Sequence, residues 1–165
     1  MNKSGFTLIE LLTTIAIIAI MATIAIPNII GWLPGYRLRS ATRDIVSCLQ
    51  NAKLRAVKEN ERVVVIFNQL NESYVSFIDN VPAGGNWSLD GTETIVGRET
   101  LPAGIDIQSI PLTTSYTVGY NSRGLSASGA DSIQMINTKS HYTRISINLA
   151  GSIRVQMSSD GIVWN

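Results

Sequence analysis

The feature that most constrains this 165-residue chain is a long uncharged run behind a single acidic residue. After Glu10 no charged residue occurs until Arg37, and residues 11–30 are almost all Leu, Ile, Ala, Met and Thr. At about 1.5 Å per residue, a 20-residue helix extends about 30 Å, which is the thickness of the hydrocarbon core of a bilayer. The run therefore predicts a helix that spans a membrane.

Glu10 is the unusual residue in this segment. A charged side chain at the centre of a membrane helix costs roughly 2.5–3.5 kcal/mol on insertion scales, so an acid at its entrance implies a partner or a function. An anchor alone would not need Glu10. We expect the segment to dock onto a group that carries a positive charge.

The remaining residues have the composition of one modest domain, about 100–125 residues long. The last hundred residues are rich in Ser, Thr, Asn and Gly, which suits a polar-surfaced β domain. The total charge is only +1, although residues 37–62 carry +4 and the later residues −3. This balance argues against a dedicated nucleic-acid binder and leaves a local basic patch open. Cys48 is the only cysteine, so an internal disulfide is excluded.

Two ordinary interpretations of the N-terminus are a secretory signal and a simple membrane anchor. A secretory signal needs a small-residue cleavage site, and Thr23-Ile24-Ala25 is a poor one. A simple anchor, with Lys3 keeping the N-terminus in the cytoplasm, explains the length of the run. It leaves Glu10 unexplained.

A third interpretation comes from residues 3–12, Lys-Ser-Gly-Phe-Thr-Leu-Ile-Glu-Leu-Leu. They resemble the prepilin signature of type IV pilins and type II secretion pseudopilins. The resemblance implies cleavage between Gly5 and Phe6 by a prepilin peptidase and N-methylation of Phe6. Glu10 would then lie one helical turn from the new amine. Because an unpaired carboxylate in an apolar core is penalised, we expect Glu10 to pair with the amine of the next subunit during assembly.

The chain is thus expected to have four parts. These are a leader (1–5), a transmembrane and filament-core helix (6–30), a hinge (31–36) and a globular pilin domain (37–165). Pro27 lies inside the apolar run and predicts a helix kink, with a simple end of the span as the alternative. Gly31, Pro34 and Gly35 predict a break or hinge.

Within the domain, apolar residues recur at helical spacing over 37–60, which predicts an amphipathic helix. Its predicted apolar stripe is Leu38, Ala41, Ile45, Cys48, Leu49, Ala52 and Ala56. Residues 61–165 are predicted to be a β domain. Its strands are expected at 62–67, 73–78, 95–101, 105–110, 116–120, 132–136, 142–148 and 152–157, with turns at 68–71, 121–124 and 150–151. The fold class is α+β, with a long N-terminal helix packed on antiparallel sheets, as in pilins.

Residues 43–60 resemble the helix of the GspH/FimT group, with its Leu-Gln-x-Ala-x-x-x-Ala spacing. Residues 120–124 and 145–151 resemble later parts of the same group. The resemblance implies a minor pilin or pseudopilin at or near the tip of a filament. It also implies a single-pass inner-membrane protein with a cytoplasmic N-terminus and an extracytoplasmic domain. Its partners would be the prepilin peptidase, other pilins and the inner membrane.

The residues that support catalysis or metal binding are sparse. His141 is the only histidine, and no glycine-rich stretch has the phosphate-binding pattern. We therefore expect a structural protein, with no cofactor and no metal site, that is a substrate of a peptidase and not an enzyme.

The basic residues allow two interpretations. Arg37, Arg39 and Arg43 can contact lipid headgroups or neighbouring pilins. Alternatively they serve DNA uptake, since some FimT-type pilins carry Gly-Arg-x-Arg near the C-terminus. Here residues 151–154 read Gly-Ser-Ile-Arg, so Arg154 is present without the first arginine. A secretion pseudopilin, a type IV minor pilin, a DNA-binding minor pilin and an anchored solute-binding domain remain open.

Overall fold

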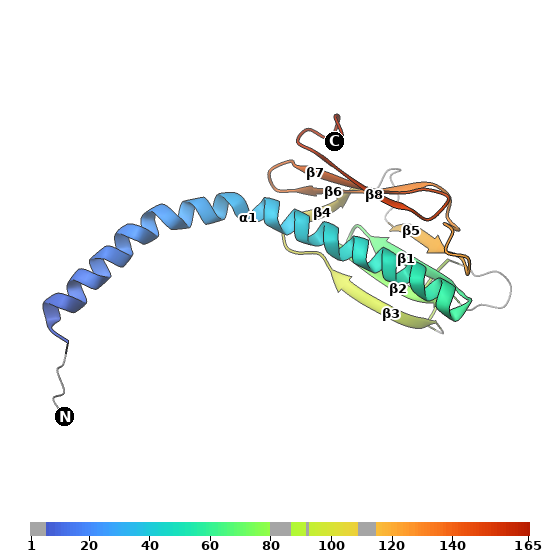
Figure 1. The fold of residues 1–165 in the computed structure, drawn as a ribbon, viewed down its shortest axis with the longest axis horizontal. Helices are drawn as coiled ribbons and strands as arrows, with labels where there is room; N and C mark the ends of the chain where they lie inside the picture. Colours follow the sequence, from blue (N-terminus) through green and yellow to red (C-terminus); the bar gives the residue numbers. More distant parts are fainter. Residues whose placement is uncertain (1–5, 80–86, 92, 109–114) are drawn as a thin grey trace, which may run out of the picture. The chain divides into compact units, whose positions relative to one another are not determined.

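The computed structural model describes residues 6–79, 87–91, 93–108 and 115–165, which form one helix and eight strands (Figure 1). The chain divides into two compact units, Met1–Leu33 and Pro34–Asn165. The elements are α1 (Leu8–Glu59), β1 (Arg62–Asn68), β2 (Ser73–Asp79), β3 (Thr94–Thr100), β4 (Ile105–Gln108), β5 (Ser115–Tyr120), β6 (Asp131–Asn137), β7 (Tyr142–Ile147) and β8 (Ile153–Ser158). The predicted α+β class and the predicted strands agree with this order, apart from shifts of one or two residues at their ends. Residues 109 and 110 of the fourth predicted strand lie outside the described residues.

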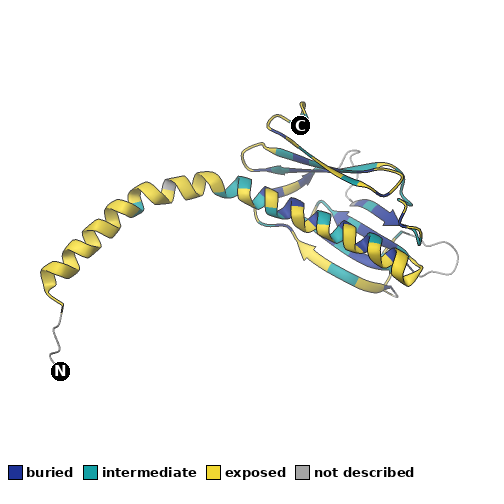
Figure 2. Ribbon diagram, viewed as in Figure 1, coloured by how far each residue is buried: buried dark blue, intermediate teal, exposed yellow. Residues whose placement is uncertain are grey.

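The first unit contains the N-terminal part of α1. Its segment Leu8–Ile26 has 19 residues with a mean hydropathy of 2.4, so by length and composition it is apolar enough to cross a membrane. Almost every described residue of this unit is exposed in the isolated chain (Figure 2).

The predicted break at residues 31–36 is wrong, because α1 is helical throughout Leu8–Glu59. A proline removes only its own amide donor, so a helix with several turns on either side survives the loss of that one hydrogen bond. Neighbouring groups can satisfy the backbone carbonyl that is freed. A hinge motion at 31–36 and a kink at Pro27 stay predictions.

In the second unit the C-terminal part of α1 has the predicted apolar stripe. Leu38, Ala41, Ile45, Leu49, Ala52 and Ala56 are all 5% exposed or less, whereas Cys48 is half-buried. After Glu59 the chain turns through Asn60, whose φ of 56° is the left-handed conformation that asparagine adopts readily at helix ends. The amide of Glu61 then donates to the carbonyl of Ala56 at 3.3 Å.

The strands form two antiparallel four-stranded sheets. The first sheet has the order β3-β2-β1-β5, and the second has the order β4-β6-β7-β8. The chain therefore leaves the first sheet for β4, returns to pair β5 with β1, and then completes the second sheet. Apolar side chains from both sheets and from the stripe of α1 form one buried cluster, which includes Phe67 of the first sheet and Ile133 and Ile145 of the second.

Asparagine side chains close two of the predicted turns. The Asn68 Oδ1 accepts from the amides of Leu70 and Asn71 at 2.9 and 3.1 Å. The Asn121 Oδ1 accepts from the amides of Arg123 and Leu125 at 3.0 and 3.1 Å. Such side-chain bonds replace backbone partners that a tight turn leaves free, which confirms both turns.

The C-terminal tail covers the outer edge of the second sheet. Asn165 and Met157 exchange two backbone hydrogen bonds of 3.1 Å, and the Arg144 guanidinium lies 3.9 Å from the centre of the Trp164 ring. An edge strand exposes unpaired backbone groups, so this pairing shields part of β8 from other chains.

The stripe of α1 leads to a direct test of the core. Replacing Leu49, which is fully buried, by Ala should reduce the free energy of unfolding by about 2–5 kcal/mol, since it leaves a cavity. Leu54 lies on the same helix but is 67% exposed, so Leu54→Ala should change the free energy of unfolding by less than about 0.5 kcal/mol. Urea unfolding of the full chain in detergent, followed by near-UV circular dichroism, measures both. Equal losses of unfolding free energy in the two variants would show that the buried stripe does not stabilise the contact between α1 and the sheets.

Candidate functional site

The predicted processing site lies at the beginning of the chain. Gly5 is outside the described residues, so the structure gives no geometry for the Gly5–Phe6 bond. Phe6 is 87% exposed and precedes the first turn of α1. The described residues therefore leave the Phe6 side chain largely uncovered.

Glu10 and Thr7 together begin the helix. The Glu10 amide donates to Thr7 Oγ1 at 3.3 Å, and the Thr7 amide donates to Glu10 Oε2 at 3.4 Å. This reciprocal arrangement is a capping box, in which a threonine and a glutamate three residues later satisfy two free amide donors. This second role of Glu10 was not predicted, although Thr-x-x-Glu before an apolar run is the sequence signature of a capping box.

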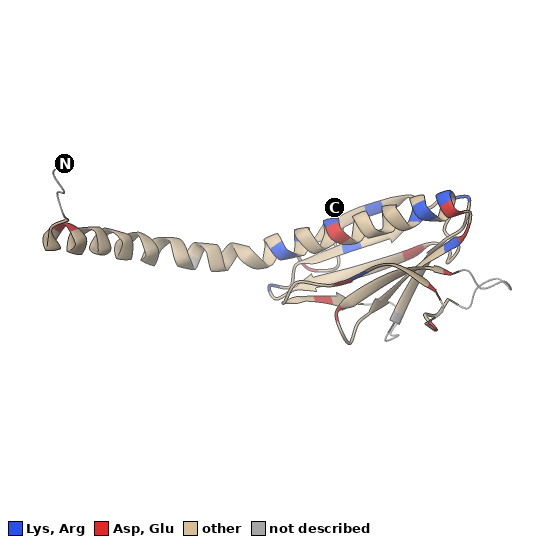
Figure 3. Cartoon of the chain, turned by 90° about the horizontal axis from the view of Figure 1, so that it is seen from below, with Lys and Arg blue, Asp and Glu red and all other residues tan. Residues whose placement is uncertain are grey.

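The helix behind Glu10 has apolar side chains on every side. Leu12, Ile15, Ile17, Ile18 and Ile20 are 54–65% exposed, and at about 100° of rotation per residue they point in all directions around the axis. A helix that is apolar all round is stable only in lipid or among other apolar helices. Figure 3 shows that the only charged residue in this part of α1 lies near its beginning. The segment therefore combines an uncovered apolar surface with one carboxylate.

Arg37 has a contact within the domain. Its Nη1 donates to the carbonyl of Ala103 at 2.9 Å, so it ties α1 to the segment that precedes β4. Arg39 and Arg43 are exposed on α1 and border a shallow pocket of about 360 Å³, together with Val155 and Met157 of β8.

Arg154 lies on a different face of the second sheet. Along β8 it is in register with Ser146 of β7, whereas the next residue, Val155, is in register with the buried Ile145. Successive residues of a strand point to opposite faces of the sheet. Val155 is on the face that meets α1, where Arg39 and Arg43 lie, so Arg154 points to the opposite face. The structure does not bring the four predicted basic residues together on one surface.

The described residues contain no group of three or more His, Cys, Asp and Glu side chains that could hold a metal ion. Cys48 is half-buried, and burial raises the pKa of its thiol, although a hydrogen bond with Ser76 acts in the opposite direction. A thiol with a raised pKa stays protonated near neutral pH and is a poor nucleophile. His141 is exposed, in the turn before β7.

Solved structures share this fold. The type IV minor pilin FimU of Pseudomonas aeruginosa aligns with a TM-score of 0.54 and 14% identity, over 71% of this chain and 90% of that one. A second crystal form of FimU gives the same TM-score at 13% identity, over 72% and 87% of the two chains. The minor pseudopilin EpsH of the Vibrio cholerae type 2 secretion system aligns with a TM-score of 0.50 and 14% identity, over 70% and 92%. At such low identity these likenesses establish the fold.

The sequence itself matches two family descriptions. Residues 1–26 match the prokaryotic N-terminal methylation motif, which contains Phe6 and Glu10. Residues 41–151 match the type II transport protein GspH, and this match covers more than half of the chain. No curated protein matches the chain. The resemblance seen in the sequence is confirmed: the chain belongs to the GspH family of pilin-like type II transport proteins.

Proposed function

We propose that this protein is a minor pilin or pseudopilin that assembles into a filament through the N-terminal part of α1. The observation that carries the proposal is the uncovered apolar segment Leu8–Ile26, with Glu10 as its single charged residue. Before assembly the lipid of the inner membrane covers this segment. In the filament, the equivalent helices of neighbouring subunits replace the lipid.

Processing prepares the segment for that exchange. A prepilin peptidase cuts between Gly5 and Phe6 on the cytoplasmic side and methylates the new amine of Phe6. The cut comes before the apolar run, so the mature protein keeps its helix. Lys3 in the leader favours the cytoplasmic orientation of the N-terminus, which leaves the domain outside the cytoplasm.

The new amine gives Glu10 a partner. Both groups lie in an environment of low dielectric, where an unpaired charge is costly and a well-placed pair is tolerated. A subunit in the correct axial register places its Glu10 carboxylate beside the amine of its neighbour. Any other register leaves both charges in the apolar core, so the pair selects the correct one.

The proposal also covers where the subunit lies in the filament and to which kind of filament it belongs. The two structural neighbours are described as a minor pilin and a minor pseudopilin, which supports a subunit of low copy number at or near the filament tip. The match to the GspH description favours a type II secretion pseudopilus over a type IV pilus. In either filament the sheets and the polar face of α1 supply the lateral contacts.

Processing has a simple mass signature. Mature protein purified from a membrane with an active prepilin peptidase should lack residues 1–5, begin at Phe6 and be one methyl group heavier than the unmodified chain. Intact-mass spectrometry and N-terminal fragmentation measure this. A mature chain that begins at Met1, or beyond Ala25, would contradict the proposal.

Two variants separate the charge of Glu10 from its role in capping the helix. Glu10→Gln keeps an oxygen that can accept from the Thr7 amide but removes the charge, so it should insert, be cleaved and fail to enter filaments. Thr7→Val keeps the charge and removes the threonine half of the capping box, which costs about 0.5–2 kcal/mol of helix stability. It should still assemble. Filaments sheared from cells and probed by immunoblot give the incorporated fraction.

Glu59→Gln at the other end of α1 is the matched control, because it removes a surface carboxylate far along the same helix. It should assemble like the unchanged protein. Normal incorporation of Glu10→Gln would show that the charge pair is not needed. Failure of Thr7→Val alone would mean that the cap, and not the charge, is the assembly determinant.

DNA binding is the alternative function, and the positions of the basic residues argue against it. Neutralising adjacent phosphates needs several cations on one surface, and binding then weakens steeply with salt. The full chain in neutral detergent should therefore show no salt-dependent affinity for a fluorescent DNA duplex between 50 and 200 mM salt. Micromolar binding that falls with salt and is lost in Arg154→Ala would favour a DNA receptor.

A further inference from the structure

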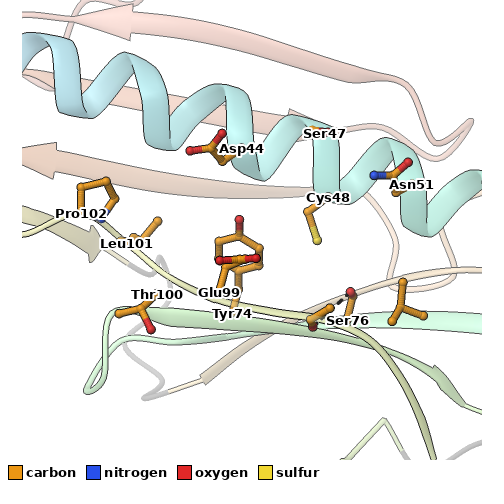
Figure 4. Close-up of a pocket in the computed structure, with 12 residues that line it drawn as sticks. Asp44, Ser47, Cys48, Asn51, Tyr74, Ser76, Glu99, Thr100, Leu101 and Pro102 are labelled. Carbon is orange, nitrogen blue, oxygen red and sulfur yellow. Dashed lines mark hydrogen bonds between the residues drawn. The ribbon is translucent and has the colours of Figure 1, made fainter.

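A pocket of about 510 Å³ lies in the domain, between α1 and the strands β2 and β3 (Figure 4). The helix contributes Asp44 and Cys48, β2 contributes Tyr74, and β3 contributes Glu99. Tyr74 and Glu99 are cross-strand partners in the register of the first sheet. None of the predicted functional residues lies in this pocket.

The charge of the pocket is negative. Asp44 and Glu99 face it from different elements, and no Lys or Arg is among the described residues that line it. Burial is the main cause that raises the pKa of the Tyr74 hydroxyl, and Cys48, Asp44 and Glu99 act electrostatically in the same direction. Both carboxylates therefore act on the same point in the pocket.

Tyr74 places a polar group in the pocket between the two carboxylates. The residue is only 5% exposed, and its ring packs on Phe67 with 5.7 Å between the ring centres. Its hydroxyl points toward α1, into the pocket, and has no hydrogen-bond partner among the described residues (Figure 4). The ring is almost wholly buried while the hydroxyl faces the pocket, so this oxygen can pair with a group that is supplied from outside.

The other end of the pocket is apolar. Leu101 is 7% exposed and Pro102 is half-buried, and both line the pocket beside the carboxylates. Lysine and arginine have an aliphatic stem and a charged head, and they bury the stem along apolar surface. The tyrosine oxygen can accept a hydrogen bond from an ammonium or guanidinium group. The pocket thus matches both halves of such a side chain.

The neighbouring strand favours an inserted side chain over an added strand. In the first sheet β3 pairs only with β2, so its outer edge is free among the described strands. Its register shifts between Ser76 and Phe77, which leaves Val96 as an extra residue. A bulge of this kind disrupts the continuous hydrogen bonding that strand addition requires.

We propose that this pocket binds a lysine or arginine side chain from a neighbouring subunit. Asp44 and Glu99 pair with the charged group, Tyr74 accepts a hydrogen bond from it, and Leu101 and Pro102 cover the stem. That the neighbour is a filament subunit rests on the proposed function. The recognition of the cationic side chain does not, because it is a property of the domain.

The test uses the full chain in neutral detergent and two dye-labelled, amidated pentapeptides. One is Gly-Thr-Lys-Thr-Gly, and the other has norleucine in place of lysine. Fluorescence anisotropy should give an affinity for the lysine peptide at least about tenfold higher, because norleucine keeps the stem and lacks the charge. Equal affinity of the two peptides, or no binding of either at millimolar protein concentration, would overturn the proposal.

Three variants locate the binding. The double variant Asp44→Asn with Glu99→Gln should abolish the preference for lysine. Tyr74→Phe should weaken the lysine peptide several-fold without loss of thermal stability, since the hydroxyl has no internal partner. Asp106→Asn, an exposed carboxylate on β4 that does not line the pocket, should change nothing. Retained preference in the double variant would refute the assignment.

The two proposals fail separately. Loss of filament entry in Glu10→Gln concerns the N-terminal helix and is measured in cells. Peptide binding is measured on the isolated chain. If the lysine peptide binds while Glu10→Gln assembles normally, the pocket assignment stands and the filament mechanism does not. If Glu10→Gln fails to assemble and both peptides bind equally, the reverse holds.

Discussion

One helix has to satisfy two different environments, and the rest of the protein depends on this constraint. Residues Leu8–Ile26 of α1 are apolar all round and need lipid or other helices, whereas residues 38–56 carry a single apolar stripe and need a protein core. The second half finds its core within the chain, where Ile45 and Leu49 are fully buried between the helix and the sheets. The first half finds no partner within the described chain. A protein built in this way is complete only in a membrane or in an assembly.

Glu10 begins the helix, and in the proposed function it also directs assembly. In the isolated chain its carboxylate accepts from the Thr7 amide and so helps to begin the helix. This bond is long and exposed, at 3.4 Å, and capping interactions are modest compared with the cost of an unpaired charge in an apolar core. The same carboxylate can therefore exchange a weak local partner for a cationic one. In the proposed function, removal of the leader would supply such a partner, since it would create an amine four residues away.

The domain adds surfaces that differ in charge. Arg39 and Arg43 border the apolar Val155 and Met157 on one side of α1, whereas Asp44 and Glu99 border an acidic pocket that is formed with β2 and β3. Residues of opposite charge thus lie close together in the sequence but serve different surfaces. Charged surfaces that meet complementary charges on a partner contribute specificity and orientation more than affinity. This property suits a subunit that assembles with other pilin-like proteins.

The sequence by itself determined the membrane-length helix, the amphipathic stripe, the order of the eight strands and the turns at Asn68 and Asn121, because each depends on local periodicity or on one side chain's bonds to nearby backbone. The break at 31–36 was predicted wrongly, since local propensity overestimates the effect of single prolines and glycines on a long helix. Only the tertiary structure decided that Arg154 faces away from Arg39 and Arg43, and that Tyr74 meets Asp44 and Glu99. These juxtapositions depend on strand register and on sheet order, which bring together residues that no local pattern connects.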